Sequence, residues 1–355
     1  MTNNTLIINY TTAATQGAYD ALKASDIGLC LRPGQAVAIK PNLVVPRPAN
    51  LGATTHPELV EGIILFLQAY GIKDISIIES SAIGESTKAA FRNCGYETLA
   101  EKYGVSLFDL KNDATTTLSH NGLKLALCNR ALHADFLINV PVLKSHSQTR
   151  MTCSLKNMKG CIPDSEKRRY HSLGLDKPIA ALNALVKTHF CVVDGICGDL
   201  SFEEGGNPVA AGRIIAGANP VMVDSFCAEL IGLRPDDIGH LKLARDLGIG
   251  EYYTEQTPVL EMNKENKTPH IKKAARLADR YSRLIEEDSA CSACYASLIY
   301  ALHRLGGSVG GEKIHIGQGF RGKSGPGIGI GNCAAGFSRH VSGCPPRAVD
   351  IVGRL

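Results

Sequence analysis

The sequence predicts an α/β protein, with a parallel or mixed sheet flanked by helices and a smaller C-terminal module that contains cysteines. Short apolar runs rich in β-branched residues alternate with longer stretches of helical periodicity, which is the pattern of a sheet covered by helices. Several of these runs are apolar at every position, as strands buried on both faces are. The expected strands cover residues 36–40, 75–79, 123–128, 136–140, 191–193 and 213–216.

A helix is expected between the first two strands. Thr55 can cap its N-terminus, and Pro57 suits the first turn because the N–H that proline lacks would have no helical partner there. Residues 58–70 then carry apolar side chains at helical spacing, and Gly71 is a typical residue to end the helix. This part of the chain therefore predicts the order strand, loop, helix, strand.

The second half of the chain predicts further helices and a domain boundary. The first two of these helices each open with a proline, and the periodicity weakens between residues 249 and 270. We therefore expect an α/β domain over 1–248, a linker with a basic amphipathic helix over 249–289, and a cysteine module over 290–355. The expected helices cover residues 220–233, 235–248, 271–285 and 295–305.

The composition argues against several classes of protein. Of 355 residues, 44% are hydrophobic, which is enough for a substantial core. Twelve cysteines without an N-terminal signal sequence predict reduced thiols and a cytoplasmic location. No apolar run approaches the roughly 18 residues that span a bilayer. A net charge of +4 without any tryptophan is a poor signature of nucleic-acid binding, so we expect neither membrane nor nucleic acid as a partner.

Four cysteines near the C-terminus have the spacing of a metal-cluster site. Cys291 and Cys294 are separated by two residues, so that one turn can present both thiolates to one metal centre. Cys344 precedes a proline, as in ferredoxin-type sequences, and it lies in a different glycine-rich turn from Cys333. A zinc ribbon would instead return with a second C-x-x-C pair. The pattern favours a [4Fe-4S] cluster over zinc, and small apolar residues at turns without a metal are the remaining alternative.

The number of cysteines bears on the role of such a cluster. Four thiolates saturate a four-iron cluster, whereas a hydratase-type cluster keeps one iron open and needs only three. Electron transfer or a structural role is therefore favoured over Lewis-acid chemistry. The glycine-rich run 325–331 lacks the strand-to-helix context of a dinucleotide fingerprint, and we expect it to let backbone amides approach the cluster.

Polar loops that follow the predicted strands form a candidate anion pocket. In open α/β sheets, ligands bind in the crevice outside the carboxyl ends of the strands. The segment 154–160 can add two ammonium groups and an amide from about one helical turn. These groups are typical of a site for a carboxylate or a phosphate. The candidate substrate-binding residues are Lys40, Asn42, Glu79, Lys144, Lys156, Asn157 and Lys159.

Two histidines are candidates for proton transfer in this pocket. His146 and His56 can act as general acid or base, because histidine titrates near neutral pH. His171 offers a weaker case, because it falls in an expected charged loop. For each of these residues the alternative is a solvated side chain on a surface loop.

Five motifs occur in order along the first two thirds of the chain: Lys40-Pro-Asn-Leu, Thr55-His56-Pro, Ile78-Glu-Ser-Ser, Asn139-Val-Pro-Val-Leu-Lys-Ser-His146 and Ser154-Leu-Lys-Asn-Met-Lys-Gly160. Together they resemble the bacterial and archaeal domain-of-unknown-function family 362. The resemblance covers roughly residues 35–235, and it implies no agreed reaction. Members of that family often carry iron–sulfur ligands, commonly as an attached ferredoxin, whereas this chain has one dispersed set of four cysteines.

These observations predict an iron–sulfur protein that acts as a redox enzyme on a small anionic substrate bound over the sheet. One alternative is an electron- or cluster-transfer protein that docks a redox protein partner through its basic helix. Another is a zinc-stapled binding protein. The first hypothesis requires the polar loops to converge on a cavity near the four cysteines, whereas the second requires no deep pocket.

Overall fold

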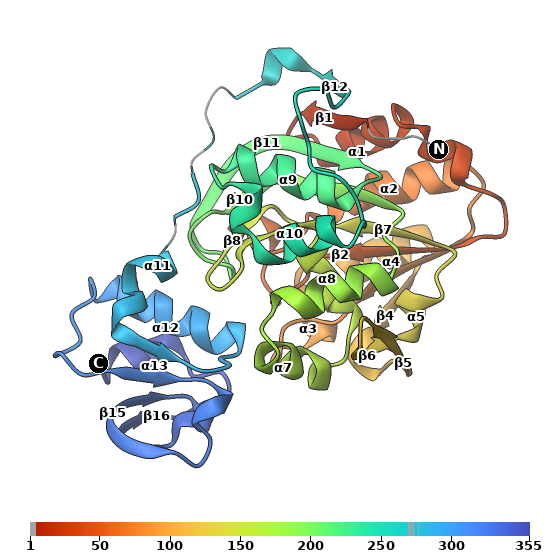
Figure 1. The fold of residues 1–355 in the computed structure, drawn as a ribbon. Coiled ribbons are helices and arrows are strands. Elements are labelled where there is room, and N and C mark those ends of the chain that lie inside the picture. The colour runs from red at the N-terminus through yellow and green to blue at the C-terminus, as the bar shows by residue number, and fades with distance from the viewer. Residues whose placement is uncertain (1–4, 269–270, 272, 276) are drawn as a thin grey trace.

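A mixed eight-stranded sheet is the largest element of the computed structural model, which describes residues 5–268, 271, 273–275 and 277–355 (Figure 1). Its strand order is β12-β1-β11-β10-β7-β2-β3-β4. The strands from β10 through β7, β2 and β3 to β4 run parallel, whereas β11 is antiparallel to both of its neighbours. The predicted α/β fold class is confirmed. The strands are β1 (Leu6–Tyr10), β2 (Ala36–Pro41), β3 (Asp74–Glu79), β4 (Ser106–Asp109), β7 (Phe136–Val140), β10 (Phe190–Asp199), β11 (Pro208–Gly217) and β12 (Val259–Met262).

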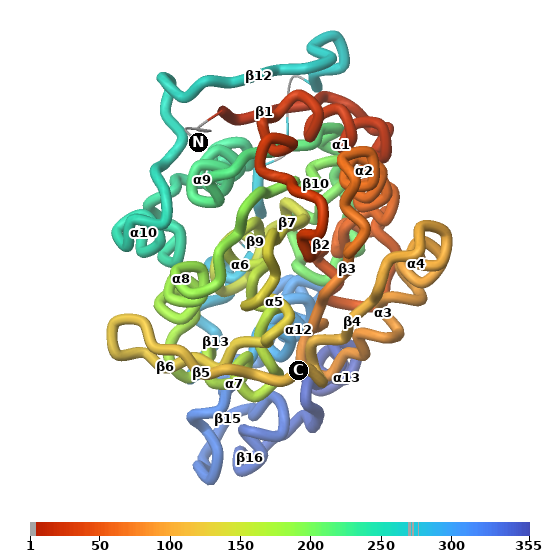
Figure 2. Tube along the Cα trace, turned by 90° about the vertical axis from the view of Figure 1, so that its right-hand side faces the viewer, coloured from red at the N-terminus to blue at the C-terminus, as the bar shows by residue number. Residues whose placement is uncertain are grey.

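Helices cover both faces of this sheet, as Figure 2 shows edge-on. Each face has its own buried apolar cluster, one against α1 and α2 and the other against α8, α9 and α10. The strands between them are buried on both sides, which explains their continuously apolar sequences. The helices are α1 (Ala14–Lys23), α2 (Pro57–Ala69), α3 (Thr87–Asn93) and α4 (Tyr96–Tyr103) on the first face, with α8 (Asp176–Leu185), α9 (Pro220–Leu230) and α10 (Gly239–Asp246) on the second.

Two small hairpins and three short helices stand outside these layers. The predicted strand 123–128 forms, but it pairs only with β5 in a separate two-stranded sheet and is not part of the large sheet. Its burial alternates along half its length, as expected of a strand with one solvated face. These elements are β5 (Thr115–His120), β6 (Leu123–Cys128), β8 (Lys144–His146), β9 (Arg150–Thr152), α5 (Asn129–Leu132), α6 (Ser154–Asn157) and α7 (Asp164–Ser172).

The structure shifts several predicted helix ends. His56, and not Thr55, is the N-cap of α2, because the Thr55 hydroxyl instead donates to Val140 O at 2.7 Å and accepts from Asn42 N. The predicted helix 220–233 ends at Leu230. The predicted helix 235–248 divides into a 3-10 turn over Pro235–Asp237 and α10.

A second, all-parallel sheet forms near the C-terminus, with its own buried apolar cluster. The glycine-rich run 325–331 lies largely within β15 of this sheet, and its last residues, Ile330 and Gly331, lie beside the four cysteines, so its approach to a cluster stays a prediction. The predicted helix 295–305 is confirmed as part of α12. The elements are β13 (Ile285–Glu287), α12 (Ser292–Arg304), β14 (Ile314–Ile316), β15 (Ser324–Ile330), β16 (Gly336–Val341) and α13 (Ala348–Val352).

The basic helix predicted over 271–285 does not form as one element. Its described part contains the short helix α11 (Leu277–Tyr281), a 3-10 turn over Ser282–Leu284, and the start of β13 at Ile285. Ile285 is buried because it pairs with Ile314 in the C-terminal sheet, so sheet formation overrides the helical periodicity there. Residues 272 and 276 of this prediction lie outside the described residues.

Candidate functional site

The carboxyl ends of three neighbouring parallel strands, β2, β7 and β3, meet at a cavity of about 110 Å³. Lys40 and Asn139 are register partners, and Glu79 is the last residue of β3, so the polar motifs reach the same edge of the sheet. The structure brings together all the predicted substrate-binding residues and one predicted histidine. The cavity is lined by Lys40, Asn42, Glu79, Lys144, His146, Lys156, Asn157 and Lys159, among others.

A buried ion pair forms one wall of this cavity. The Lys40 ammonium lies 2.8 Å from Glu79 Oε2, and it also donates to Pro41 O and to Asn157 Oδ1. Gly160 packs against the pair so closely that a Cβ there would lie 1.9 Å from Glu79 Oε1. Because its ammonium is already paired and bonded, Lys40 holds this wall in place and has little capacity to bind an anion.

An amide network connects the strand ends behind the cavity. Asn157 accepts from Asn42 Nδ2 at 2.8 Å and donates to Asn139 Oδ1 at 2.7 Å. Asn42 in turn accepts from Lys144 Nζ, which also donates to Ala53 O. Burial lowers the pKa of Lys144 to about 8, despite the opposing charge of nearby carboxylates. Asn157 is thus a structural centre of the site.

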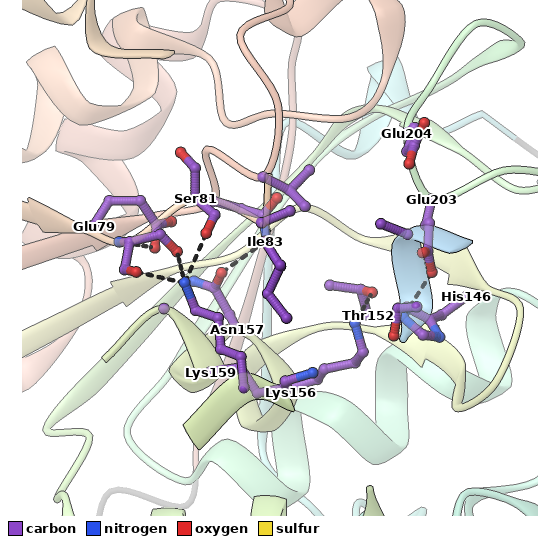
Figure 3. Close-up of a pocket in the computed structure, with 18 of the residues that line it drawn as sticks. Glu79, Ser81, Ile83, His146, Thr152, Lys156, Asn157, Lys159, Glu203 and Glu204 are labelled. Carbon is purple, nitrogen blue, oxygen red and sulfur yellow. Dashed lines mark hydrogen bonds and ion pairs between the residues drawn. The ribbon is translucent and has the colours of Figure 1, made fainter. Parts of the chain in front are cut away.

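Two lysines give the cavity its unpaired positive charge. Lys156 and Lys159 lie three residues apart on α6 and the turn that follows it, and neither forms an ion pair within the described part of the chain. Figure 3 shows them between Glu79 on one side and the pair of His146 and Glu203 on the other. Burial lowers the pKa of Lys156 to about 8, and burial and the charge of Lys156 lower that of Lys159 to about 7. A bound anion would relieve the repulsion between the two ammonium groups.

His146 is held in one tautomer by its surroundings. Its Nδ1 accepts from the backbone N–H groups of Gln148 and Thr149, both at 3.1 Å, so the proton of the neutral ring is on Nε2. Nε2 lies 2.6 Å from Glu203 Oε2. Burial, with the charge of Lys156, lowers the pKa of His146 to about 3 against the effect of Glu203. His146 and Glu203 can therefore share a proton only along the Nε2 side.

The structure does not bring His56 to the cavity. Its ring Nδ1 and its backbone N lie 2.7 and 2.8 Å from Asp194 Oδ2, and it is not among the residues that line the site. Burial opposes the charged ring, but the Asp194 carboxylate outweighs it and raises the pKa of His56. His56 serves to join the start of α2 to β10, and the prediction that it moves a proton in this pocket is corrected.

Four charged or titratable residues of the cavity were not assigned to it from the sequence. Lys167 and His171 lie four residues apart on α7, so His171 is on a helix and not in a loop as predicted. Glu203 and Glu204 come from the loop after β10. Burial would raise the pKa of Glu203, but His146 and the nearby lysines lower it to about 2, while burial and Glu203 raise that of Glu204 to about 7. The four-residue spacing of Lys167 and His171 is the one sequence signal that could have indicated that both side chains lie on one face of a helix.

All four predicted cluster ligands line a second, smaller cavity of about 30 Å³. Cys291 is the N-cap of α12 and Cys294 lies in its first turn, whereas Cys333 is in the 3-10 turn Asn332–Ala334 and Cys344 follows β16. Burial, and then the neighbouring thiols, raise the pKa of Cys294 to about 12. Within the described residues, no three His, Cys, Asp or Glu side chains are placed to hold a single metal ion.

The donor set is one that a [4Fe-4S] cluster can use, because four thiols line one cavity. Arg321 Nε lies 3.4 Å from Cys333 Sγ and can stabilise a thiolate there. A Cβ at Gly331 would lie 3.9 Å from Cys294 Sγ, so the backbone approaches the sulfur closely.

The two cavities share one wall residue. Cys291 lines both the anion cavity and the four-cysteine cavity, and its neighbour Ser292 also lines the first. Contacts from the large domain hold this segment: Gln148 donates to Ala290 O at 2.9 Å and accepts from Ser292 Oγ at 2.8 Å. A ligand in the anion cavity would therefore lie next to one of the candidate cluster ligands.

A family model described as "Domain of unknown function (DUF362)" matches residues 37–229, which is more than half of the chain. The chain belongs to the DUF362 family. The predicted anion-binding residues, Lys167, His171 and both glutamates of the 203–204 loop lie inside the DUF362 region, whereas the four cysteines lie beyond it.

One curated relative and two solved structures are similar to this DUF362 protein. The thylakoid-associated protein sll1697 of Synechocystis sp. (strain ATCC 27184 / PCC 6803 / Kazusa) is 28% identical over 242 residues, which cover 65% of this chain and 74% of the relative. The lactate racemase apoprotein from Thermoanaerobacterium thermosaccharolyticum is 16% identical with a TM-score of 0.43, covering 64% of this chain and 57% of that one. A Thermotoga maritima protein is 12% identical with a TM-score of 0.39, covering 66% and 58%. The chain thus spans less than two thirds of both solved structures.

No described helix has the length and apolar character needed to cross a membrane.

Proposed function

We propose that this DUF362 protein is an iron–sulfur redox enzyme that binds a small carboxylate or phosphate over its large sheet. The observation that carries the proposal is the position of Cys291, in the wall of both the anion cavity and the four-cysteine cavity. An electron carrier that only docks a partner has no need of a charged, enclosed cavity beside its cluster. The shared wall therefore favours an enzyme over the electron- or cluster-transfer alternative.

The charge of the cavity supports an anionic substrate. Lys156 and Lys159 have no ion-pair partner among the described residues, while the carboxylates of Glu79 and Glu203 lie close to Lys40 and His146. A carboxylate or phosphate between the two free ammonium groups would pair charges that are otherwise buried and repel each other. Asn42, bonded to Lys144 and Asn157, keeps the strand ends in position around it.

Each group of the cavity has a distinct role in this proposal. Lys156 and Lys159 bind the anion, and His146 with Glu203 holds or moves a proton at Nε2. When bound by the four cysteines, a [4Fe-4S] cluster supplies one-electron transfer, and the electrons are exchanged with a redox protein partner. The reduced state of the many free cysteines is consistent with a cytoplasmic protein.

The proposal is tested by metal analysis of anaerobically purified protein. We expect about four irons and four acid-labile sulfides per chain, with broad visible absorption, and their loss in the double variant Cys291→Ser/Cys344→Ser. The variant Cys197→Ser, which changes a half-buried cysteine outside the module, is the matched control and should keep the cluster. One zinc per chain and no sulfide would instead support the zinc-stapled alternative and overturn the redox role.

A further inference from the structure

His171 has a buried ring nitrogen without a partner at the junction of the two cavities. It lies on α7, its side chain is only 7% exposed, and it lines the anion cavity. Its Nε2 is 3.4 Å from the backbone N of Ser292, the residue after Cys291. Its Nδ1 is buried and has no hydrogen-bond partner in the part of the chain that the structure describes.

The contact with Ser292 fixes which nitrogen of His171 carries the proton. A backbone N–H can only donate, so Nε2 must offer its lone pair to Ser292. The proton of the neutral ring is then on Nδ1, which makes that atom a donor. Buried donors without acceptors are rare in folded proteins, and they are a reason to look for a ligand. His171, which lines the anion cavity, therefore has an unsatisfied N–H.

The charges around His171 define what can accept this hydrogen bond. Burial makes a positive charge on its ring costly, and the neighbouring ammonium groups of Lys159 and Lys156 disfavour it further. They equally disfavour a cationic ligand. A ligand that accepts from Nδ1 and lies near two free ammonium groups must carry oxygen acceptors and negative charge.

The cavity has room for a small anion. Its volume of about 110 Å³ corresponds to space for on the order of ten water molecules, since about 10–15 Å³ is needed for each. A phosphate ion or a short dicarboxylate fits this space. The two ammonium groups, which have no ion-pair partner among the described residues, match the two negative charges of such a dianion.

We propose that the site takes a small dianion, either phosphate or a short dicarboxylate, and that His171 donates to one of its oxygens through Nδ1. The dianion is held by Lys156 and Lys159, and the Nε2 contact of the same ring positions the segment that carries Cys291. This inference rests on the proposed function, because it assigns a substrate class to the same cavity.

Two substitutions separate ligand binding from a purely structural role of His171. In His171→Gln the side-chain oxygen can reach the place of Nε2 and still accept from Ser292, but no donor remains near the place of Nδ1. In His171→Asn the shorter amide can place a donor near Nδ1 but loses the Ser292 contact. The exposed His133 lies outside the cavity, so His133→Gln is the matched control.

Calorimetric titration of the anaerobically purified full chain with inorganic phosphate, and separately with oxalate, measures the effect. We expect His171→Gln to weaken binding about tenfold or more, as loss of a hydrogen bond to a charged acceptor does, and His171→Asn to weaken it less than His171→Gln. Whichever of phosphate and oxalate binds more tightly identifies the subclass of dianion. Equal affinity in His171→Gln and wild type, or a larger loss in His171→Asn than in His171→Gln, would overturn the role of His171.

A second measurement covers the case in which a variant does not fold. Nitrogen-15 spectra of the histidine rings in wild-type protein should show His171 protonated at Nδ1, with a shift when phosphate or oxalate is added. Protonation at Nε2 would overturn the inference. If wild type binds neither anion, this inference and the anion-binding part of the proposed function both fail. Wild-type protein that binds the anion but contains no cluster would contradict only the redox part.

Discussion

The anion cavity and the cysteine cavity are built in different ways, although they share Cys291. The anion cavity lies at the ends of buried parallel strands, and its polar groups are joined by hydrogen bonds such as that between Lys144 and Asn42. The cysteine cavity is assembled from helix ends and turns, and its cysteines range from half-buried to exposed at Cys344. The first is therefore preorganised by the fold, whereas we propose that the second needs a bound cluster to bring the thiolates together.

The largest expected effect is on the stability of the anion cavity. Glu79→Gln should lower the free energy of unfolding by about 3–5 kcal/mol, because it leaves the buried Lys40 charge without its partner. Chemical denaturation measures this loss. The matched control is Glu97→Gln, which breaks an exposed pair with Arg92 and should leave the midpoint almost unchanged. Similar midpoints for the two variants would show that the cavity wall is not preorganised by this pair.

A substitution in the cysteine cavity should remove the metal and leave the anion cavity almost unchanged. Cys344→Ser should abolish iron and sulfide binding, because it removes a cluster ligand, yet it should change phosphate or oxalate affinity by less than about threefold, since Cys344 does not line the anion cavity. Metal analysis and calorimetry on the same preparation test both points. If anion affinity were lost together with the iron, the two regions would be one cooperative unit.

Removing a free ammonium group should affect binding and leave the fold intact. Lys156→Met should weaken phosphate or oxalate binding by about tenfold to a hundredfold, the value of a hydrogen bond between charged groups. It should not destabilise the protein, because the ammonium has no ion-pair partner among the described residues. Lys242→Met, on the exposed side of α10, is the control for calorimetry and thermal unfolding. Unchanged affinity in Lys156→Met would remove this lysine from the site.

The smallest expected effect is a pH dependence of anion binding. Burial lowers the pKa of Lys156 to about 8, and burial and the charge of Lys156 lower that of Lys159 to about 7, so each ammonium group is charged below its pKa and loses its charge above it. Sulfate, which stays a dianion throughout, should bind most tightly near pH 6 and progressively more weakly as the pH rises through 7 and 8. Calorimetric titrations across this range measure how sulfate affinity changes with pH. An affinity that rises with pH would contradict the prediction.

The sequence predicts the residues of the anion cavity that lie at strand ends better than those that come from later loops and helices. Lys40, Glu79 and Lys144 could be placed together because each lies at or just after a strand end, and parallel strands share one carboxyl edge. Glu203 could not, because nothing local indicates that the loop after β10 folds back on His146. His171 is only a weaker candidate from the sequence, because the charged residues around it predict a loop where the structure has the helix α7.

In the C-terminal region too, local sequence patterns do not reveal which distant segments come together. The spacing of Cys291 and Cys294 reveals a shared turn, but their approach to Cys333 depends on a four-stranded parallel sheet that the sequence did not suggest. The helix predicted over 271–285 failed where Ile285 pairs in that sheet. Local periodicity could not report this long-range pairing. The wall shared by the two cavities is likewise a tertiary feature.

The most direct test of the shared wall is to record the electron paramagnetic resonance spectrum of the reduced, anaerobically purified protein during titration with oxalate or phosphate. A dianion bound beside Cys291 should change the spectrum, with a saturation midpoint equal to the Kd from calorimetry, and Lys156→Met should move both values together. A cluster spectrum that stays unchanged while calorimetry shows the anion binding would contradict the claim that the substrate cavity adjoins the cluster.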